Sequence, residues 1–174
     1  MDLSKRDFTT AAPAADFDAF YRREYPNIRA LTWTLTGDVG TAEDITQEAL
    51  MRAHTRWAVV SGYDEPGAWV RRVAINLATS VLRRRGREVR ALVRIQARPK
   101  DDWDHLPPHD REFWAAVRAL PPRQAAVIAL HYYEDLPVSD IAAVLDVAEG
   151  TVKAQLHQGR HNLARRLGIE EEPS

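Results

Sequence analysis

Six polar side chains that can donate hydrogen bonds lie close together near the end of the sequence. They are Thr151, Lys153, Gln155, His157, Gln158 and His161. Hydroxyl, ammonium, amide and imidazole groups bind phosphate oxygens and the hydrogen-bonding edges of bases. This is the chemistry of a helix that lies in the major groove of DNA.

The apolar residues of the same segment have helical spacing. Four of them fall at i, i+4, i+11 and i+15 and form one stripe: Val152, Leu156, Leu163 and Leu167. Gly159 lies on this stripe, where the missing side chain lets a neighbouring helix approach closely. The whole segment Ile141–Leu167 predicts two helices joined by a tight turn, a helix-turn-helix.

Positive charge is concentrated in the middle of the chain, although the net charge is only −1. Residues 67–100, here called the basic block, contain ten basic residues and one acidic residue, whereas residues 1–66 contain seven basic and eleven acidic residues. The basic block is typical of a phosphate-binding surface whose affinity falls as salt rises. A solvated helix face followed by a basic linker has the same composition.

The organisation is that of an all-α protein, because no segment alternates like a strand. We expect two small helical domains, the second with the helix-turn-helix, joined by a charged linker that contains prolines. The expected parts are a flexible tail (1–15), a first domain (16–86), the linker (87–109), a second domain (110–168) and an acidic tail (169–174).

Local signals within the first domain suggest where its helices begin and end. Pro26 predicts a kink or break in the first helix. Residues 36–40 have the composition of a loop, and Thr41 is the expected N-cap of the next helix with Asp44 as its capping-box partner. Pro66 suits the first turn of a third helix.

Composition excludes several other classes of protein. There is no cysteine, hence no disulfide or thiolate metal site, which favours the cytoplasm. No apolar run approaches about 18 residues, and the N-terminus lacks a signal-peptide core, so no membrane insertion is expected. His157 and His161 have a metal-binding spacing but no third ligand nearby. With no phosphate loop or nucleophile motif, we expect no metal, no cofactor and no catalysis.

Four motifs in a fixed order carry a family resemblance. They are AEDITQEALMRA (Ala42–Ala53), PGAWVRRVAINLATSVLRRR (Pro66–Arg85), LPPRQAAVIALHYYEDL (Leu120–Leu136) and GTVKAQL (Gly150–Leu156). Their order and spacing resemble the extracytoplasmic-function sigma factors, bacterial initiation factors with only regions 2 and 4. The resemblance implies a cytoplasmic factor that binds RNA polymerase core, directs it to −10 and −35 promoter elements and helps to open the duplex.

The helix that starts near residue 42 resembles the one that docks on the clamp helices of the polymerase. The resemblance assigns core binding to Asp44, Gln47 and Glu48. These residues lie at i, i+3 and i+4 and therefore share one surface. An ordinary solvated helix face has the same pattern.

The helix after Pro66 resembles the one that meets the −10 element. The candidate −10 contacts are Tyr63, Arg72, Asn76, Arg83 and Arg84. Tyr63 and Asn76 have the stacking and hydrogen-bonding groups that an unpaired base needs, and the three arginines suit phosphates. Trp69 matches an aromatic position of the family, but its place on the apolar stripe favours core packing.

The helix-turn-helix resembles the reader of the −35 duplex. The candidate −35 contacts are Thr151, Lys153, Gln155, His157 and Gln158. Thr151 and Lys153 match the family pattern near a helix N-terminus, where phosphate is favoured. Gln155 and Gln158, like Ala154, depart from it: Arg, Arg and Ser are common there. Since Arg prefers guanine and Gln prefers adenine, a different −35 sequence or a lower affinity is expected.

Two further departures lie at the start and the end of the first helix of the helix-turn-helix. Asp146 stands at the turn position where glycine is common. Aspartate tolerates a left-handed backbone better than most residues, so we expect the turn to survive at some cost. Pro137 replaces a common serine and gives up a side-chain cap, but proline suits a helix start.

Two alternatives stay open at this point. A stand-alone helix-turn-helix regulator would explain residues 138–167, but not the motif at Ala42–Ala53. Binding to polymerase core without DNA would distinguish the two classes. The resemblance also implies an anti-sigma partner, and the acidic flanks of the basic block predict masking of its charge if the two domains close on each other.

Overall fold

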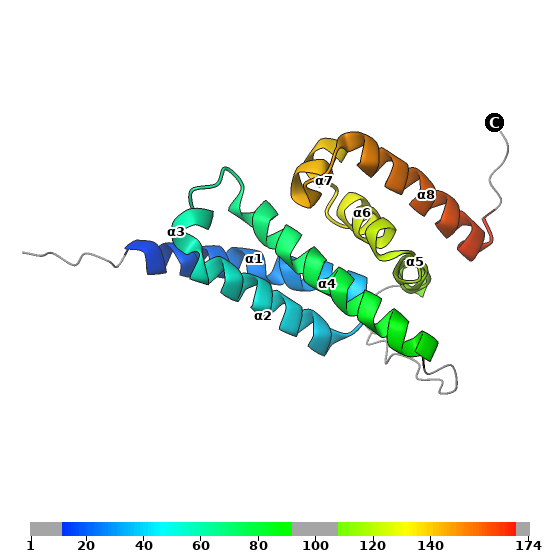
Figure 1. Cartoon of the computed structure of the whole chain (residues 1–174), viewed down its shortest axis with the longest axis horizontal. Coiled ribbons are helices and arrows are strands. Elements are labelled where there is room, and N and C mark those ends of the chain that lie inside the picture. Colours follow the sequence, from blue (N-terminus) through cyan, green and yellow to red (C-terminus); the bar gives the residue numbers. More distant parts are fainter. Residues whose placement is uncertain (1–11, 92–107, 170–174) are drawn as a thin grey trace, which may run out of the picture.

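The computed structural model describes residues 12–91 and 108–169, and all of its regular elements are α-helices. They are α1 (Ala12–Thr36), α2 (Val39–Thr55), α3 (Trp57–Val60), α4 (Pro66–Ala91), α5 (Pro108–Arg118), α6 (Pro122–Tyr132), α7 (Val138–Leu145) and α8 (Glu149–Leu167). The predicted all-α class is therefore confirmed. In Figure 1, α1–α4 form a first half and α5–α8 a second half that lies against α1 and α4.

The first half is built around a core between α1, α2 and α4. Ile28, Leu31 and Leu50 are fully buried there. The break expected at Pro26 is absent, because α1 is continuous through it. Pro26 lies on the exposed side of the helix, so the carbonyl that loses its partner faces water. Burial on both sides of Pro26, by Phe20 and Ile28, favours continuing the helix.

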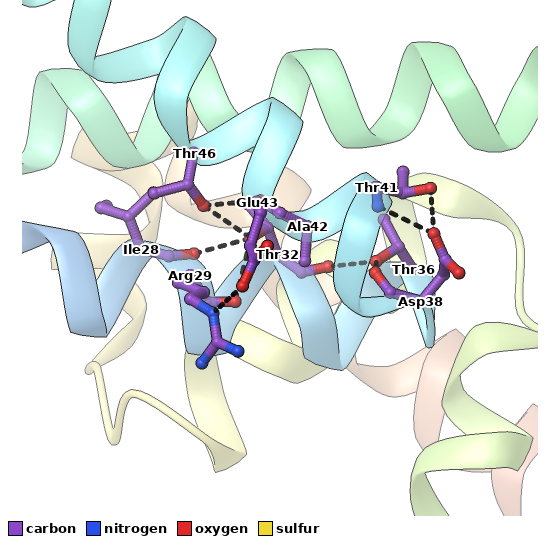
Figure 2. A network of polar contacts seen from close by, with 9 residues as sticks. All are labelled: Ile28, Arg29, Thr32, Thr36, Asp38, Thr41, Ala42, Glu43 and Thr46. Carbon is purple, nitrogen blue, oxygen red and sulfur yellow. Dashed lines mark hydrogen bonds and ion pairs between the residues drawn. The ribbon is translucent and has the colours of Figure 1, made fainter. Parts of the chain in front are cut away.

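The start of α2 also differs from the prediction. Asp38, rather than Thr41, is the N-cap: its carboxylate accepts hydrogen bonds from the backbone N–H of Thr41 at 2.8 Å and from the Thr41 hydroxyl (Figure 2). Asp38 has the extended backbone of an N-cap, which leaves Thr41 inside the first turn. Gly37 makes this early start possible, because its φ of 67° lets the chain turn immediately after α1.

The second half surrounds α6, which is buried over residues 124–130. The predicted stripe of α8 is confirmed at Val152, Leu156 and Leu163, which are buried. The close approach predicted at Gly159 is also confirmed: a Cβ there would lie 3.0 Å from Cγ1 of Ile128 on α6.

The helix-turn-helix consists of α7 and α8. Its turn is intact: Asp146 adopts the left-handed conformation (φ 57°, ψ 51°) and donates its N–H to the carbonyl of Ala142. Pro137 precedes α7 without a side-chain cap, as expected. Aspartate adopts this conformation at lower cost than most non-glycine residues, so the turn does not need a glycine here.

The described helices cover only part of the expected linker. The last turns of α4 extend past Arg85 to Ala91, and α5 begins at Pro108. The linker between them, at residues 92–107, lies outside the described residues, as do residues 1–11 of the first tail and 170–174 of the acidic tail.

Candidate functional site

The α2 surface carries the three residues assigned to core binding. Asp44 and Gln47 are exposed, and Glu48 is half-buried. Glu48 accepts a hydrogen bond from Nε of Arg52 at 2.7 Å, one turn further on. The structure therefore places the three side chains on one side of α2, with two of them unobstructed.

A buried threonine network holds α2 against α1 (Figure 2). The hydroxyls of Thr32 and Thr46 lie 3.1 Å apart, and both bond to the carbonyl oxygen of Ala42, at 3.2 and 2.7 Å. Both threonines are fully buried, so their hydroxyls need these partners. The network sets the position of α2 along α1, and sequence reasoning missed it because threonine on a helix is usually exposed.

A shallow groove beside the α2 surface was not predicted. Its lining residues are Glu48, Met51, Arg52, Thr55, Arg56, Trp69 and Val73. Met51 is 65% exposed, which is a large apolar exposure for a helix residue. Trp69 packs against the core from α4, as expected, and its outer side reaches this groove.

The candidate −10 residues are spread along α4 and the loop before it. Tyr63 is 45% exposed in the loop, and Asn76, Arg83 and Arg84 are exposed on the helix. Arg72 is about 16 Å from Arg83 along the axis, at 1.5 Å per residue. The structure does not gather these residues at one point, but arranges them along a line.

Arg72 is occupied by the second half. Its Nε and Nη2 donate to the carbonyl oxygens of Val144 and Ala143, at 2.7 and 2.6 Å. Its Nη1 lies 3.4 Å from the Asp146 carboxylate. These carbonyls belong to the last turn of α7, where backbone acceptors are unpaired and the helix dipole is negative. The Asp146 side chain is 81% exposed, so its ion pair with Arg72 adds little beside the two backbone hydrogen bonds.

Arg71 makes a second contact between the halves. Its Nε lies 2.9 Å from the Glu134 carboxylate, and its Nη2 lies 3.7 Å from that of Glu24. Both glutamates are about 10% exposed or less, so the pairing is nearly desolvated. Arg85 lies 3.9 Å from the Asp38 carboxylate. Glu134 and Asp146 of the second half thus neutralise part of the charge of the basic block, as predicted for a closed arrangement, whereas Glu24 and Asp38 do so within the first half.

A cavity of about 300 Å³ lies between α4 of the first half and α6–α8 of the second half. Its lining includes Asn76 and Arg83 on α4, and Thr151 and Gln155 on α8. Candidate residues for −10 and −35 contact therefore lie on opposite walls of one cavity. With the halves together, these parts of α4 and α8 face each other.

The other candidate −35 residues of α8, Lys153, His157 and Gln158, are exposed and do not line this cavity. Of the two residues on the cavity wall, Thr151 is exposed and Gln155 is half-buried. Lys153 forms a surface ion pair with Glu149 at 3.6 Å, a contact of little energetic weight. In the described part of the chain no group of three or more His, Cys, Asp or Glu residues could hold a metal ion.

Among the residues that the structure describes, the pKa values of two side chains are shifted. The hydroxyl and the N–H of Thr41, and to a smaller extent the charge of Arg85, lower the pKa of Asp38. Burial, and then the charge of Glu134, raise the pKa of Tyr133. Neither group lies on the outer face of α8. No helix within residues 12–91 and 108–169 is long and apolar enough to cross a membrane.

Comparison with known proteins identifies both halves. The model of sigma-70 region 2 matches residues 20–88, and that of sigma-70 region 4 matches residues 105–163. The ECF RNA polymerase sigma factor SigL of Mycobacterium tuberculosis is 33% identical over 169 residues, which cover 91% of this chain and 93% of that protein.

Two further proteins extend the comparison. The ECF sigma factor SigE of Mycolicibacterium smegmatis is 32% identical over 87% of this chain, which spans only 62% of its length. The sigma factor RpoE of Bartonella quintana, solved with the anti-sigma factor NepR, aligns with a TM-score of 0.65 at 26% identity, over 90% of this chain and 99% of that one. The chain belongs to the extracytoplasmic-function sigma factors of bacterial RNA polymerase.

Proposed function

We propose that this protein binds RNA polymerase core in the cytoplasm, directs it to −10 and −35 promoter elements and helps to open the duplex. The observation that carries the proposal is the presence, in one chain, of an exposed α2 surface and a helix-turn-helix, each within a matched sigma region. Sigma factors are initiation factors and not enzymes. Linking both DNA-reading parts to the polymerase raises their effective concentration at a promoter.

The α2 surface is the proposed docking site for the clamp helices of the polymerase. Asp44 and Gln47 are exposed, and the buried threonine network keeps the helix that carries them in place. Glu48 would contribute from the edge, beside Met51. A rigid helix surface is favourable for docking, because little conformational entropy is lost on binding.

The proposed DNA contacts use the two long helices. Tyr63, Asn76, Arg72, Arg83 and Arg84 would contact the −10 element, and Thr151, Lys153, Gln155, His157 and Gln158 the −35 element. The bonds of Arg72 to α7 mean that it reaches a phosphate only after the halves separate. We therefore propose that residues 16–86 and 110–168 act as separate domains on the polymerase, with residues 87–109 as the linker.

An anti-sigma factor is the proposed regulatory partner. The Bartonella quintana sigma factor, similar over nearly the whole chain, was solved with such a protein. The halves of this chain expose different groups when closed and when apart, so a partner that binds one arrangement would control activity.

Transcription with purified polymerase core tests the proposed function. We expect the wild-type chain to bind core without DNA and to start transcripts from a subset of a promoter library. Asp44→Arg combined with Gln47→Arg places positive charge on the docking surface and is expected to weaken core binding at least about tenfold, with the helix content unchanged.

Glu112→Lys is the matched control, because it changes charge at an exposed residue of α5, away from α2. It is expected to bind core normally. Normal transcription by the doubly substituted α2 variant would contradict the docking assignment. DNA binding by a wild-type chain that never binds core would favour the stand-alone regulator instead.

A further inference from the structure

Three amides and one guanidinium form a chain of hydrogen bonds between α6 and α8. Arg165 Nη2 donates to Asn162 Oδ1 at 2.9 Å. Asn162 Nδ2 donates to Gln124 Oε1 at 2.9 Å. Gln124 Nε2 donates to Gln158 Oε1 at 3.4 Å. The chain thus leads from the end of α8, through a buried residue of α6, to an exposed candidate −35 residue.

The direction of this chain follows from its first member. Oxygen and nitrogen of an amide are hard to distinguish by shape alone, so their assignment rests on their partners. A guanidinium can only donate hydrogen bonds, so the atom of Asn162 that faces Arg165 must be its oxygen. That leaves the Asn162 nitrogen to donate to Gln124, whose own nitrogen must then donate to Gln158.

Gln124 is suited to hold this arrangement. Its side chain is buried, with 7% of the residue exposed, so both ends of its amide require partners. Turning the amide over would set its nitrogen against the nitrogen of Asn162 and its oxygen against the oxygen of Gln158. The bond to Asn162 would be lost at this buried position even if Gln158 turned its own amide in response, and that loss is costly.

We propose that Gln124 is a positioning residue that turns the amide of Gln158 so that only its N–H groups face DNA. Gln158 then selects a base with an acceptor at the groove edge, guanine (O6 and N7) or thymine (O4). It disfavours cytosine, which presents only an amino donor at the groove edge, and adenine, whose amino donor leaves N7 as its single acceptor. The inference rests on the proposed function and replaces the adenine preference expected for this glutamine from its residue type.

Gln155 provides the contrast on the same helix. Within the described chain its amide has no hydrogen-bond partner, so it can turn freely and pair with both groups of adenine. The two glutamines of α8 are therefore assigned different base preferences, although their side chains are identical.

Selection from a promoter library with a randomised −35 element, using polymerase core and the full chain, tests the inference. Gln158→Ala first identifies the base position that depends on Gln158. At that position the wild type is expected to favour guanine or thymine over adenine or cytosine by about three- to tenfold.

Asn162→Asp is the decisive variant. Its carboxylate only accepts, so it keeps the bond from Arg165, draws the nitrogen of Gln124 toward itself and leaves the oxygen of Gln124 facing Gln158. Gln158 must then turn its nitrogen inward and its oxygen toward DNA. The expected result is a reversed preference, for adenine or cytosine, with unchanged preference at the Gln155 position.

Gln124→Met and Arg165→Met break the series of hydrogen bonds without reversing its direction. Both are expected to reduce the base preference at the Gln158 position to less than about twofold. They carry the test if Asn162→Asp fails to fold, as judged by circular dichroism. The inference is overturned if the wild type prefers adenine at the Gln158 position, or if these variants leave the preference unchanged. In either case continued transcription leaves the proposed function intact. Absence of core binding or of any −35 preference overturns the proposed function as well.

Discussion

At the scale of single residues, the N-cap Asp38 makes the stability of the folded protein depend on pH. Its carboxylate accepts two hydrogen bonds from Thr41 and lies near Arg85, and these contacts lower its pKa. A carboxyl group with a lowered pKa stabilises the folded state above its unfolded pKa. That contribution is lost as the pH falls through the folded pKa.

Asp38→Ala is expected to lower the free energy of unfolding by about 1 kcal/mol at neutral pH, because the N-cap is lost. Asp38→Asn keeps an N-cap oxygen but has no charge, so its stability should fall less than that of the wild type below about pH 4. Urea unfolding at neutral and acidic pH measures both effects. Parallel pH profiles for Asp38→Asn and the wild type would contradict this role of the carboxylate.

At the scale of elements, the contact between α6 and α8 depends on a missing side chain. A Cβ at Gly159 would lie 3.0 Å from Cγ1 and 3.2 Å from Cδ1 of Ile128. Gly159→Ala gains about 1 kcal/mol of helix propensity but overpacks this contact by about 1–3 kcal/mol. The net expectation is a destabilisation of about 1 kcal/mol.

The same substitution in an Ile128→Ala background should have the opposite sign. Ile128→Ala removes both atoms that the new methyl group would meet, so the helix propensity of alanine then adds to stability. Chemical unfolding of the four proteins gives the coupling between the two sites. Equal effects of Gly159→Ala in both backgrounds would show that the close approach has no energetic cost.

Helix positions were predictable where the hydrophobic spacing alone decides them. The stripe of α8 and the turn at Asp146 are examples, since each follows from local periodicity or backbone preference. Of the kink or break expected at Pro26, the break is absent, because burial on both sides outweighs one lost hydrogen bond. The cap expected at Thr41 was wrong because Asp38, three residues earlier, accepts from the N–H and hydroxyl of Thr41.

The candidate site also has features that the sequence predicts and features that it does not. The exposed α2 surface and the outer side of α8 follow from helical spacing, and their roles stay predictions. The bonds of Arg72 to α7 and the path from Arg165 to Gln158 were not predictable. They depend on how elements far apart in the sequence meet, and neither residue has an unusual sequence context.

At the scale of the whole molecule, the second half packs against α1 and α4, and the polar contacts of α4 join the two halves. Arg71 bonds to Glu134, and Arg72 bonds to carbonyl oxygens of α7. The arrangement occupies Arg72, a proposed −10 contact, and sets Asn76 opposite Gln155 across the cavity. Under the proposed function, the chain opens before Arg72 can bind a phosphate.

Arg72→Ala is expected to favour the open arrangement by roughly three- to tenfold, because two hydrogen bonds and an ion pair are lost. Energy transfer between dyes on Arg56→Cys and Ser139→Cys, both exposed positions, measures the separation of the halves. The chain has no native cysteine, so labelling is specific. Arg87→Ala removes an exposed charge from the same helix and serves as the control. Equal transfer in both variants would contradict a latch at Arg72.

The adjacency of Arg71 and Arg72 has a geometric consequence. Neighbouring residues of an α-helix project about 100° apart around its axis, since one turn takes 3.6 residues. Arg71 and Arg72 bond to different parts of the second half. Together they restrict the rotation of α4 about its own axis as well as its distance from that half. A small rotation of α4 would strain both contacts together. The two arginines together therefore fix the orientation of α4 against the second half, which neither of them could fix alone.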